Sequence, residues 1–327
     1  MRRAFLTGGT GFLGRHLIER LMADGWHVTA LHRSESPPDW FAQDSVTPVR
    51  GDITDADSVR AAMPDGVDAV LHAAADTSPW RGHRARQERV NIGGTQTVLE
   101  AARAAGAKRV VHVSSIAVWG HQDGMIDETS PRLAAHSRIG YLRTKALAET
   151  RVEAAIAGGQ DAVIVNPAHI IGRYDTANWA RMIRLIDRDA LPGVPPGAGC
   201  FANAAAVAEA VIAAVDKGRT GERYILGGPQ ARFLEMVRII ARLLDKPEPR
   251  RTVPAALLFA VGWLGNMRGW LTGREPELTP EAADFVCHRL DCRSDKAMAE
   301  LGYRIVPLAD SLTESVAWLR TEGLIGG

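Results

Sequence analysis

Short apolar runs alternate with helical apolar patterns through the first half of the chain. Runs that predict β-strands lie at residues 4–6, 27–32, 46–50, 69–72 and 109–113. After the first run, Leu13, Leu17 and Leu21 recur with apolar neighbours at the spacing of one helix face. A succession of strands and helices is typical of an α/β fold, so we predict a parallel, doubly wound sheet.

The turn between the first strand and the first helix is rich in glycine. It satisfies both Gly9-x-Gly11-x-x-Gly14 and Gly8-x-x-Gly11-x-x-Gly14. A diphosphate is bulky and charged, and a backbone without side chains lets it approach closely. The helix that follows presents free N–H groups and the positive end of its dipole. The turn therefore predicts a dinucleotide site, and a glycine turn used only for tight packing is the alternative.

The ends of the next three strands carry candidate cofactor contacts. The second strand ends His32-Arg33-Ser34, without the carboxylate that takes the ribose hydroxyls of NAD. Arg33 suits the 2′-phosphate of NADP, so we expect NADP as the cofactor. The alternatives are that the cofactor is NAD, or that Arg33 is an ordinary exposed arginine without a role in binding. Asp52 follows the third strand, where it can accept the adenine amino group or else cap a helix. Ala73–Ala75 leave room for a ribose or nicotinamide against the backbone.

A serine, a tyrosine and a lysine supply the candidate catalytic chemistry. The fifth strand delivers Ser114 and Ser115 at its carboxyl end, which is where open α/β sheets bind their ligands. A helix downstream carries Tyr141 and Lys145, which share one helix face because they stand four positions apart. A phenol with a pKa of about 10 is a poor acid or base at neutral pH, and an adjacent ammonium lowers that pKa.

These motifs together resemble the extended short-chain dehydrogenase/reductase family. The matching segments are residues 7–14, Asp52, Leu71–Ala74, Asn91–Thr95, Ser114–Gly120, Tyr141–Lys145 and Pro167. The nearest likeness is to the dihydroflavonol 4-reductase-like and 3β-hydroxysteroid dehydrogenase-like branch, and the chain also resembles hopanoid-associated members labelled as sugar epimerases. It departs from the family at Phe201–Ala206, where a His-Val-x-Asp pattern is common, so substrate details cannot be carried over there.

The resemblance implies a Rossmann-type fold and a set of site residues. Ser115, Tyr141 and Lys145 would be the catalytic trio, with Ser114 as a neighbour. The expected cofactor-binding residues are Gly8, Thr10, Gly11, Phe12, Leu13, Gly14, Arg33, Asp52, Ile53, Ala73, Ala74, Ala75, Tyr141, Lys145 and Pro167. No metal site is expected.

The chain is expected to divide into two interleaved domains. Residues 1–167 would form the dinucleotide-binding domain, to which a strand near 223–227 returns by resemblance to the family. Residues 168–327 would form a smaller, mostly helical substrate domain. Its most apolar stretch, 253–271, predicts either a buried helix or an apolar wall or lid over the substrate.

The composition limits the kinds of binding partner and the cellular location that we expect. The chain has 39 Lys and Arg residues and 38 Asp and Glu residues, so it lacks the net positive charge that would attract nucleic acid. Cys200, Cys287 and Cys292 lack the spacing of a metal finger. No apolar run is long enough to span a bilayer, and Met1 to Arg3 lead directly into the first strand, so we expect a cytoplasmic protein without a signal peptide. Alanine-rich helices at 84–105 and 141–157 predict a homodimer, as in many family members.

Three functions compete. The first is an NAD(P)-dependent oxidoreductase that interconverts a ketone and a secondary alcohol on a hydrophobic small molecule, with Tyr141 as the general acid or base. The second is a nucleotide-sugar epimerase or dehydratase with bound NAD. The third is a non-catalytic cofactor binder, which the intact serine, tyrosine and lysine disfavour. Arg33 and the apolar stretch 253–271 favour the first over the second.

Overall fold

A seven-stranded parallel sheet organises the protein. In the computed structural model, which describes residues 1–326, the strands lie in the order β10-β7-β5-β4-β1-β2-β3, and all neighbours are parallel. Their bounds are β1 (Arg3–Thr7), β2 (His27–His32), β3 (Val46–Arg50), β4 (Ala69–His72), β5 (Val110–Val113), β7 (Ala162–Pro167) and β10 (Arg223–Leu226). The predicted doubly wound sheet is confirmed, because the strand order runs outward in both directions from β1 and β4.

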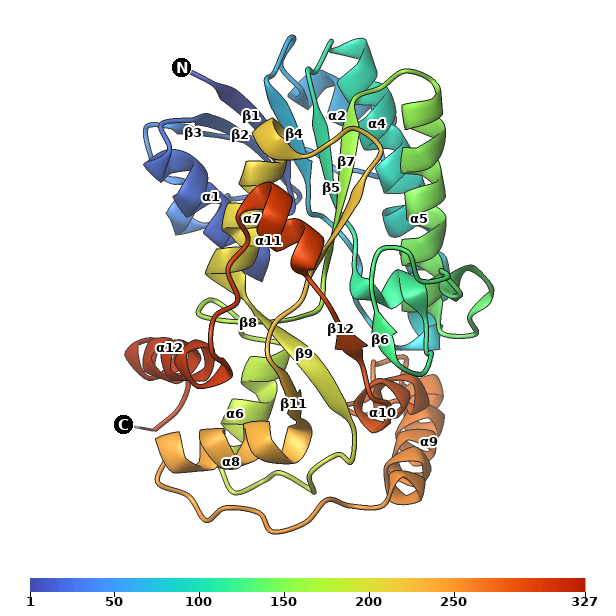
Figure 1. Cartoon of the computed structure of the whole chain (residues 1–327), viewed down its shortest axis with the longest axis vertical. Coiled ribbons are helices and arrows are strands. Elements are labelled where there is room, and N and C mark those ends of the chain that lie inside the picture. Colours follow the sequence, from blue (N-terminus) through green and yellow to red (C-terminus); the bar gives the residue numbers. More distant parts are fainter. Residues whose placement is uncertain (327) are drawn as a thin grey trace.

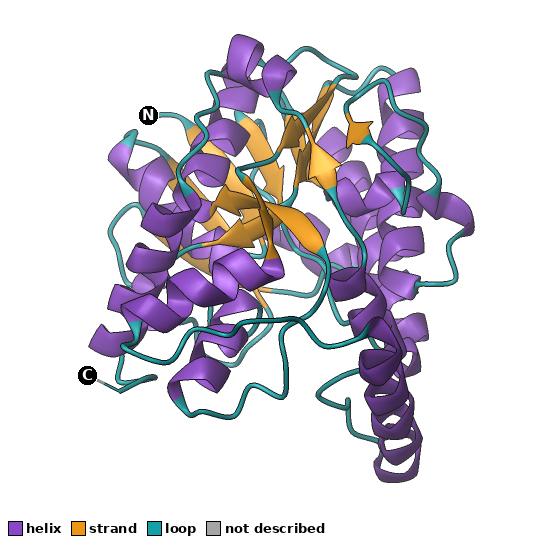
Figure 2. Ribbon diagram, turned by 60° about the horizontal axis from the view of Figure 1, so that its bottom comes forward, coloured by secondary structure: helices purple, strands orange, loops and turns teal. Residues whose placement is uncertain are grey.

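Helices cover both faces of this sheet (Figures 1 and 2). One face packs against α1 (Phe12–Ala23), α7 (Ala204–Lys217) and α11 (Asp295–Leu301). The other packs against α2 (Ala56–Ala62), α4 (Gly94–Ala104) and α5 (Gly140–Ala157). Apart from the edge strand β3, which is largely exposed, the strands between them are buried on both sides, which is why they read as apolar runs rather than as alternating patterns.

The helix expected at 84–105 is interrupted. It consists of α3 (Arg84–Gln87), a π-helical turn over Glu88–Gly93, and α4. The buried Asn91 lies in the π-helical turn, and its side chain bonds to the backbone of Asp76 at both the N–H (2.7 Å) and the carbonyl (3.0 Å). Wide turns of this kind are frequent at functional sites.

The C-terminal part is mostly helical, as expected, and it also contains short strands. A small sheet has the order β11-β9-β8. It consists of β8 (His169–Ile171), β9 (Ala198–Asn203) and β11 (Gln230–Arg232). It shares a core with α6 (Trp179–Asp187), α8 (Phe233–Leu243) and α12 (Leu308–Thr321). The division near residue 167 stays a prediction, because α7 and α11 lie beyond it and still pack on the large sheet.

Two further helices form a separate edge of the molecule. Figure 1 shows α9 (Ala255–Thr272) at the lower right, beside α10 (Pro280–Cys287). After α10 the chain forms β12 (Asp291–Cys292), which pairs in parallel with β6 (Met125–Ile126). Among the described residues, none of the helices has the length and hydropathy to cross a membrane.

Candidate active site

A cavity lies over the carboxyl ends of β1, β2, β3 and β4. Its lining consists of Thr7, Gly8, Thr10, Gly11, Leu31, His32, Arg33, Gly51, Asp52, Ile53, Ala73, Ala74, Ala75 and Val90. Nine of the predicted cofactor residues are in this set. Thr7, Leu31, His32, Gly51 and Val90 were not among the expected cofactor-binding residues, although the first four stand at or next to strand ends and could have been found by that position.

Glycine holds the turn tightly against the end of β4. Gly8 has a φ of 80°, and a Cβ there would lie 2.6 Å from the Ala74 nitrogen. A Cβ on Gly14 would lie 2.0 Å from the Gly8 carbonyl oxygen. At Gly11 the same carbonyl oxygen, at 3.3 Å, is the one close neighbour among the described residues, so this glycine leaves open backbone at the cavity wall.

The start of α1 suits an anion. Its N-cap, Gly11, provides no side-chain cap, and its first turn carries no acidic residue. The first-turn N–H groups, which include those of Phe12 and Leu13, have no partner within the helix. Free N–H groups at a helix N-terminus beside a cavity fit the diphosphate of a dinucleotide.

The far side of the cavity would meet the adenosine half. Arg33 is exposed just past β2, and no carboxylate stands at that strand end. Asp52 does not cap α2, because Asp55 does so by accepting the N–H groups of Asp57 and Ser58. Asp52 Oδ1 instead accepts both the N–H and the hydroxyl of Thr54, each at 2.9 Å. This pairing orients the carboxylate at the cavity wall.

The structure brings the three candidate catalytic residues together. Ser115 follows β5 and precedes a 3₁₀ turn, and its Oγ accepts the Ala117 N–H at 3.1 Å. Tyr141 lies in the first turn of α5, where its hydroxyl is within hydrogen-bonding reach of Ser115. Lys145 lies one turn later, is 3% exposed, and donates to the Val113 carbonyl at 2.9 Å. Pro167 stands at the carboxyl end of β7, and Ser114 is buried after β5.

Burial controls the proton affinities of these groups. It raises the pKa of Tyr141 above its ordinary value, and the hydrogen bond with Ser115 offsets part of that rise. It lowers the pKa of Lys145 to about 8, against the opposing effect of Glu149. The expectation that Lys145 lowers the pKa of Tyr141 is therefore wrong for the free protein, because desolvation dominates and the ammonium bonds to a backbone carbonyl. A phenol in this state stays protonated and can donate a proton to an oxygen.

A buried polar chain that the sequence analysis did not identify runs behind the trio. His72 bonds through its two ring nitrogens to the hydroxyls of Thr7 (2.7 Å) and Thr95 (3.0 Å). Thr95 donates to the Asn91 carbonyl at 2.7 Å, and Asn91 donates to the Thr144 hydroxyl at 3.0 Å. This chain ties the glycine turn to the helix that carries Tyr141. Its sequence signals were a histidine ending β4 and the Asn91–Thr95 motif.

A buried carboxylate fixes the other side of the site. Asn166 donates to the Ser115 carbonyl at 3.1 Å and to Glu149 at 2.6 Å. Glu149 is fully buried, and its other oxygen pairs with Arg132 and Arg223, each at 3.1 Å. The backbone of Ser115 is thereby held by an amide that is itself held by a paired carboxylate.

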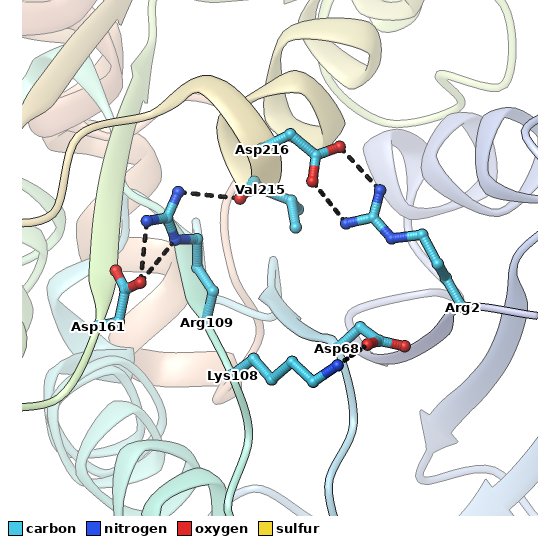
Figure 3. Close-up of a pocket in the computed structure, with 7 residues that line it drawn as sticks. All are labelled: Arg2, Asp68, Lys108, Arg109, Asp161, Val215 and Asp216. Atoms are coloured by element: carbon cyan, nitrogen blue, oxygen red, sulfur yellow. Dashed lines mark hydrogen bonds and ion pairs between the residues drawn. The ribbon is translucent and has the colours of Figure 1, made fainter.

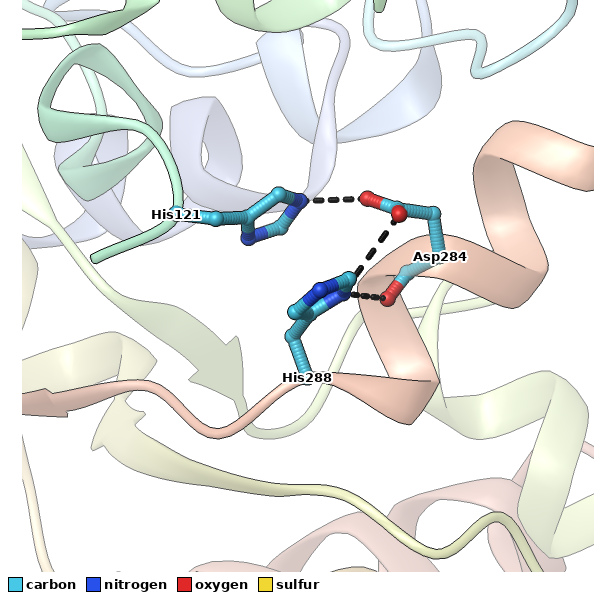
Figure 4. Close-up of side chains that lie close together, drawn as sticks. All are labelled: His121, Asp284 and His288. Carbon is cyan, nitrogen blue, oxygen red and sulfur yellow. Dashed lines mark hydrogen bonds and ion pairs between the residues drawn. The ribbon is translucent and has the colours of Figure 1, made fainter. Parts of the chain in front are cut away.

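Helix α10 closes the site near Tyr141. The ring of Phe285 lies 6.1 Å from that of Tyr141 between centroids. Beside it, Asp284 contacts the rings of His121 and His288, which stack 3.9 Å apart (Figure 4). Ligand atoms of the three residues lie within 4.8 Å of one another, a spacing that a divalent cation could use. As they stand, the three pair with one another and attach α10 to the loop after the Ser115 turn.

A second, more open pocket lies at the opposite edge of the sheet (Figure 3). It is lined by Arg2, Asp68, Lys108, Arg109, Asp161, Val215 and Asp216. Its charges pair internally, with Arg2 on Asp216 (2.6 Å), Lys108 on Asp68 (2.7 Å) and Arg109 on Asp161 (2.9 Å). Since ligands of open α/β sheets bind at the carboxyl ends of the strands, this pocket is not the active site.

Known proteins share both the sequence pattern and the fold. Residues 4–227 match the NAD dependent epimerase/dehydratase family. Sterol demethylase protein B of Methylococcus capsulatus is 31% identical, over 98% of this chain and 99% of that protein. A second relative is the 4-hydroxy-2-methyl-3-oxo-4-farnesyl-3,4-dihydroquinoline-1-oxide ketoreductase of Stigmatella aurantiaca. It is 34% identical, over 92% of this chain and 91% of that protein. The crystal structure of gox2253 superposes with a TM-score of 0.86 over the full length of both chains at 27% identity.

The expected resemblance is confirmed, because relatives also carry the names of dihydroflavonol 4-reductase and 3β-hydroxysteroid dehydrogenase. The match with the family covers the glycine turn, the serine, the tyrosine and the lysine in one continuous segment. The chain therefore belongs to the NAD dependent epimerase/dehydratase family, the extended short-chain dehydrogenase/reductases, and is an enzyme of that family.

Proposed function

We propose that this enzyme interconverts a ketone and a secondary alcohol on a lipophilic small molecule, using NADP(H). The observation that carries the proposal is the trio of buried Ser115, partly buried Tyr141 and buried Lys145 beside a cavity that fits a dinucleotide. When bound, the nicotinamide would supply or accept the hydride. Two relatives named for a sterol and for a farnesylated ketone agree with a lipophilic substrate.

Each residue of the trio has a separate task in this proposal. Tyr141 donates its phenolic proton to the carbonyl oxygen in the reducing direction and takes it back in the oxidising direction. Ser115 holds that oxygen against the phenol by a second hydrogen bond. Lys145 places a positive charge one helical turn from Tyr141 and would bond the ribose of the cofactor. With its pKa at about 8, Lys145 is mostly charged at neutral pH.

Replacement of Tyr141 by Phe tests this mechanism. The ring keeps its packing beside Phe285, and only the hydroxyl is lost. We expect kcat for NADPH-dependent reduction of a lipophilic ketone to fall by about 10²–10⁴-fold, with the dissociation constant of NADPH unchanged. Tyr174→Phe is the matched control, because it removes a hydroxyl that donates to Glu19 and lies outside the trio. Near-normal turnover in Tyr141→Phe would refute the proposal.

Arg33 is proposed to select NADP over NAD. It is exposed at the end of β2, where the 2′-phosphate of an adenosine would lie. Arg33→Ala should weaken NADPH by about tenfold or more and leave NADH nearly unchanged, since charge-assisted hydrogen bonds contribute roughly 1.5–3 kcal/mol. Arg60→Ala, an exposed arginine on α2, serves as the control. Equal losses for both cofactors would remove the basis for this assignment.

A nucleotide-sugar epimerase or dehydratase is the second candidate, favoured by the name of the matching family. Such an enzyme oxidises and re-reduces its substrate with one retained NAD. Net, stoichiometric consumption of NADPH with a ketone supports the reductase. Retained NAD, with no net change in absorbance on addition of a nucleotide sugar and with formation of its epimer, would establish the alternative.

A further inference from the structure

Helix α9 leaves an unusually apolar surface uncovered. Seven of its large hydrophobic side chains are between 46% and 87% exposed, whereas Leu258 is buried. The seven are Leu257, Val261, Trp263, Leu264, Met267, Trp270 and Leu271. They make up seven of the twelve exposed large hydrophobic residues in the described part of the chain. Concentrated exposed apolar patches mark binding surfaces, whereas isolated exposed apolar residues do not.

The opposite face of α9 is already occupied. Gly262, Gly265 and Gly269 lie against the segment 274–280, so closely that a Cβ at Gly265 would lie 2.6 Å from the Leu278 carbonyl oxygen. Asn266 accepts a hydrogen bond from the Trp80 indole at 3.0 Å. The glycine stripe therefore holds the helix on the protein, and the large apolar side chains project outward. Figure 2 shows α9 at the lower right, extending beyond the body of the molecule.

The charged residues of α9 and of its immediate flanks are all basic, and the nearest acidic residues along the chain are Glu248 before the helix and Glu275 and Glu277 on the segment that packs against the glycine stripe. Between Glu248 and Glu275 the chain carries Arg250, Arg251, Arg268 and Arg274 and no acidic residue. All four arginines are exposed, and within residues 1–326 no carboxylate forms an ion pair with any of them. Exposed leucines and tryptophans combined with unpaired arginines are typical of helices that lie in the interface of an anionic bilayer.

We propose that α9 attaches the enzyme to the surface of an anionic lipid bilayer, with the helix lying in the interface rather than crossing it. Trp263 and Trp270 would sit at the headgroup level, and Leu264 and Leu271 would reach the acyl boundary. The four arginines would meet the lipid phosphates.

The position of α9 also suggests how the substrate reaches the active site, and this inference rests on the proposed function. Helix α9 packs on α10, and α10 presents Phe285 to the ring of Tyr141. The same pair of helices thus faces the bilayer on one side and the catalytic tyrosine on the other. A lipophilic ketone dissolved in the bilayer would reach the site beside the attached helix.

Vesicle flotation without substrate or cofactor tests the attachment, so its outcome is independent of the reaction. The full-length protein is mixed with vesicles of phosphatidylglycerol and phosphatidylcholine in equal parts, or of phosphatidylcholine alone, at a salt concentration of about 0.1 M. We expect binding to the anionic vesicles and at least about tenfold weaker binding to the neutral ones. Absence of binding to the anionic vesicles would overturn the proposal.

Two variants and one control separate α9 from the rest of the surface. Leu264→Glu with Leu271→Glu, and separately Arg268→Glu with Arg274→Glu, should each weaken binding by about tenfold or more. Met298→Glu with Ile305→Glu changes two other exposed apolar residues and should bind as the wild type does. Thermal melting checks that each variant is folded. Wild-type binding by both α9 variants would refute the proposal.

A second copy of the chain is the competing occupant of this face. Light scattering without vesicles decides between the two. A monomer that binds vesicles, or a dimer that the α9 variants leave intact, supports the lipid surface. A dimer that Leu264→Glu with Leu271→Glu converts to a monomer would assign the face to self-association and overturn the proposal.

Discussion

Gly14 offers a quantitative test of the glycine turn. It is the third residue of α1, and an added Cβ would lie 2.0 Å from the Gly8 carbonyl oxygen and 2.6 Å from the Gly9 Cα. Both neighbours are backbone atoms, so no side-chain rotation can relieve the contact. Gly14→Ala must therefore displace the turn that forms the wall of the cofactor cavity.

Two effects of Gly14→Ala oppose one another. Alanine is favoured over glycine inside a helix by about 1 kcal/mol. Overpacking of a closed site typically costs about 1–3 kcal/mol of stability. Because the added Cβ would lie 2.0 Å from a backbone atom, we expect the cost at Gly14 to be at the upper end of that range. The steric cost exceeds the propensity gain, so we expect a net loss of about 2 kcal/mol in the free energy of unfolding.

Urea unfolding and cofactor titration measure the two consequences. The unfolding midpoint should fall with an unchanged slope. The dissociation constant of NADPH, followed by the fluorescence of the bound cofactor, should rise by about tenfold or more, because a shifted turn misplaces the N–H groups that would meet the diphosphate. Both measurements use the same preparation.

Gly93→Ala is the matched control. Gly93 has φ −62° and ψ −48°, is exposed, and has no neighbour within 4 Å of an added Cβ. The same substitution there should leave stability unchanged or raise it by up to about 1 kcal/mol. If Gly14→Ala were as stable as the wild type and bound NADPH equally well, the packing argument for the turn would fail.

Two further predictions concern pH and assembly. Burial lowers the pKa of His72 to about 3 and of His169 to about 4, and holds that of His112 well below 6.5. The unfolded chain therefore binds protons first as the pH falls below 6.5. His72 and His169 should each remove about 2 kcal/mol of stability by pH 5, and His112 acts in the same direction, which a flat melting temperature from pH 7 to 5 would contradict. A homodimer through α4 and α5 also stays a prediction, which light scattering that shows a monomer at micromolar concentration would reject. Its alanine argument is weaker than expected, because Ala101, Ala102, Ala146 and Ala148 are buried within the subunit.

Local patterns were sufficient for the sheet and for the glycine turn. Strands buried on both sides leave continuous apolar runs, and helices between them leave a 3.6-residue period, so the order of elements can be read along the chain. The turn at Gly8–Gly14 could be predicted because its backbone requirements, a φ of 80° and contacts below 3 Å, admit only glycine. The serine, tyrosine and lysine could be placed by their positions at one strand end and on one helix face.

Tertiary contacts decided what lies behind the trio. The chain from Thr7 through His72 and Thr95 to Asn91 joins residues from four segments, and Asn91, in the π-helical turn, accepts a hydrogen bond from Asp76 across a gap of 15 positions. The pKa of Tyr141 is raised although Lys145 stands four positions away, because burial depends on everything that surrounds the ring. Sequence spacing gives the direction of a side chain on its helix, and it does not give the dielectric environment.

Helix α9 shows the same limit most clearly. Its sequence determined a helix and an apolar composition, from which burial or a lid was expected. The buried helix is wrong, because the structure seats the glycine stripe on the protein and leaves Leu257, Val261, Trp263 and Leu264 exposed, and the wall or lid stays a prediction. An apolar side chain is more stable when it is removed from water, but its identity does not determine which surface it packs against. The closest packing goes to the face with the smallest side chains, so only the tertiary structure decided that the large ones point outward.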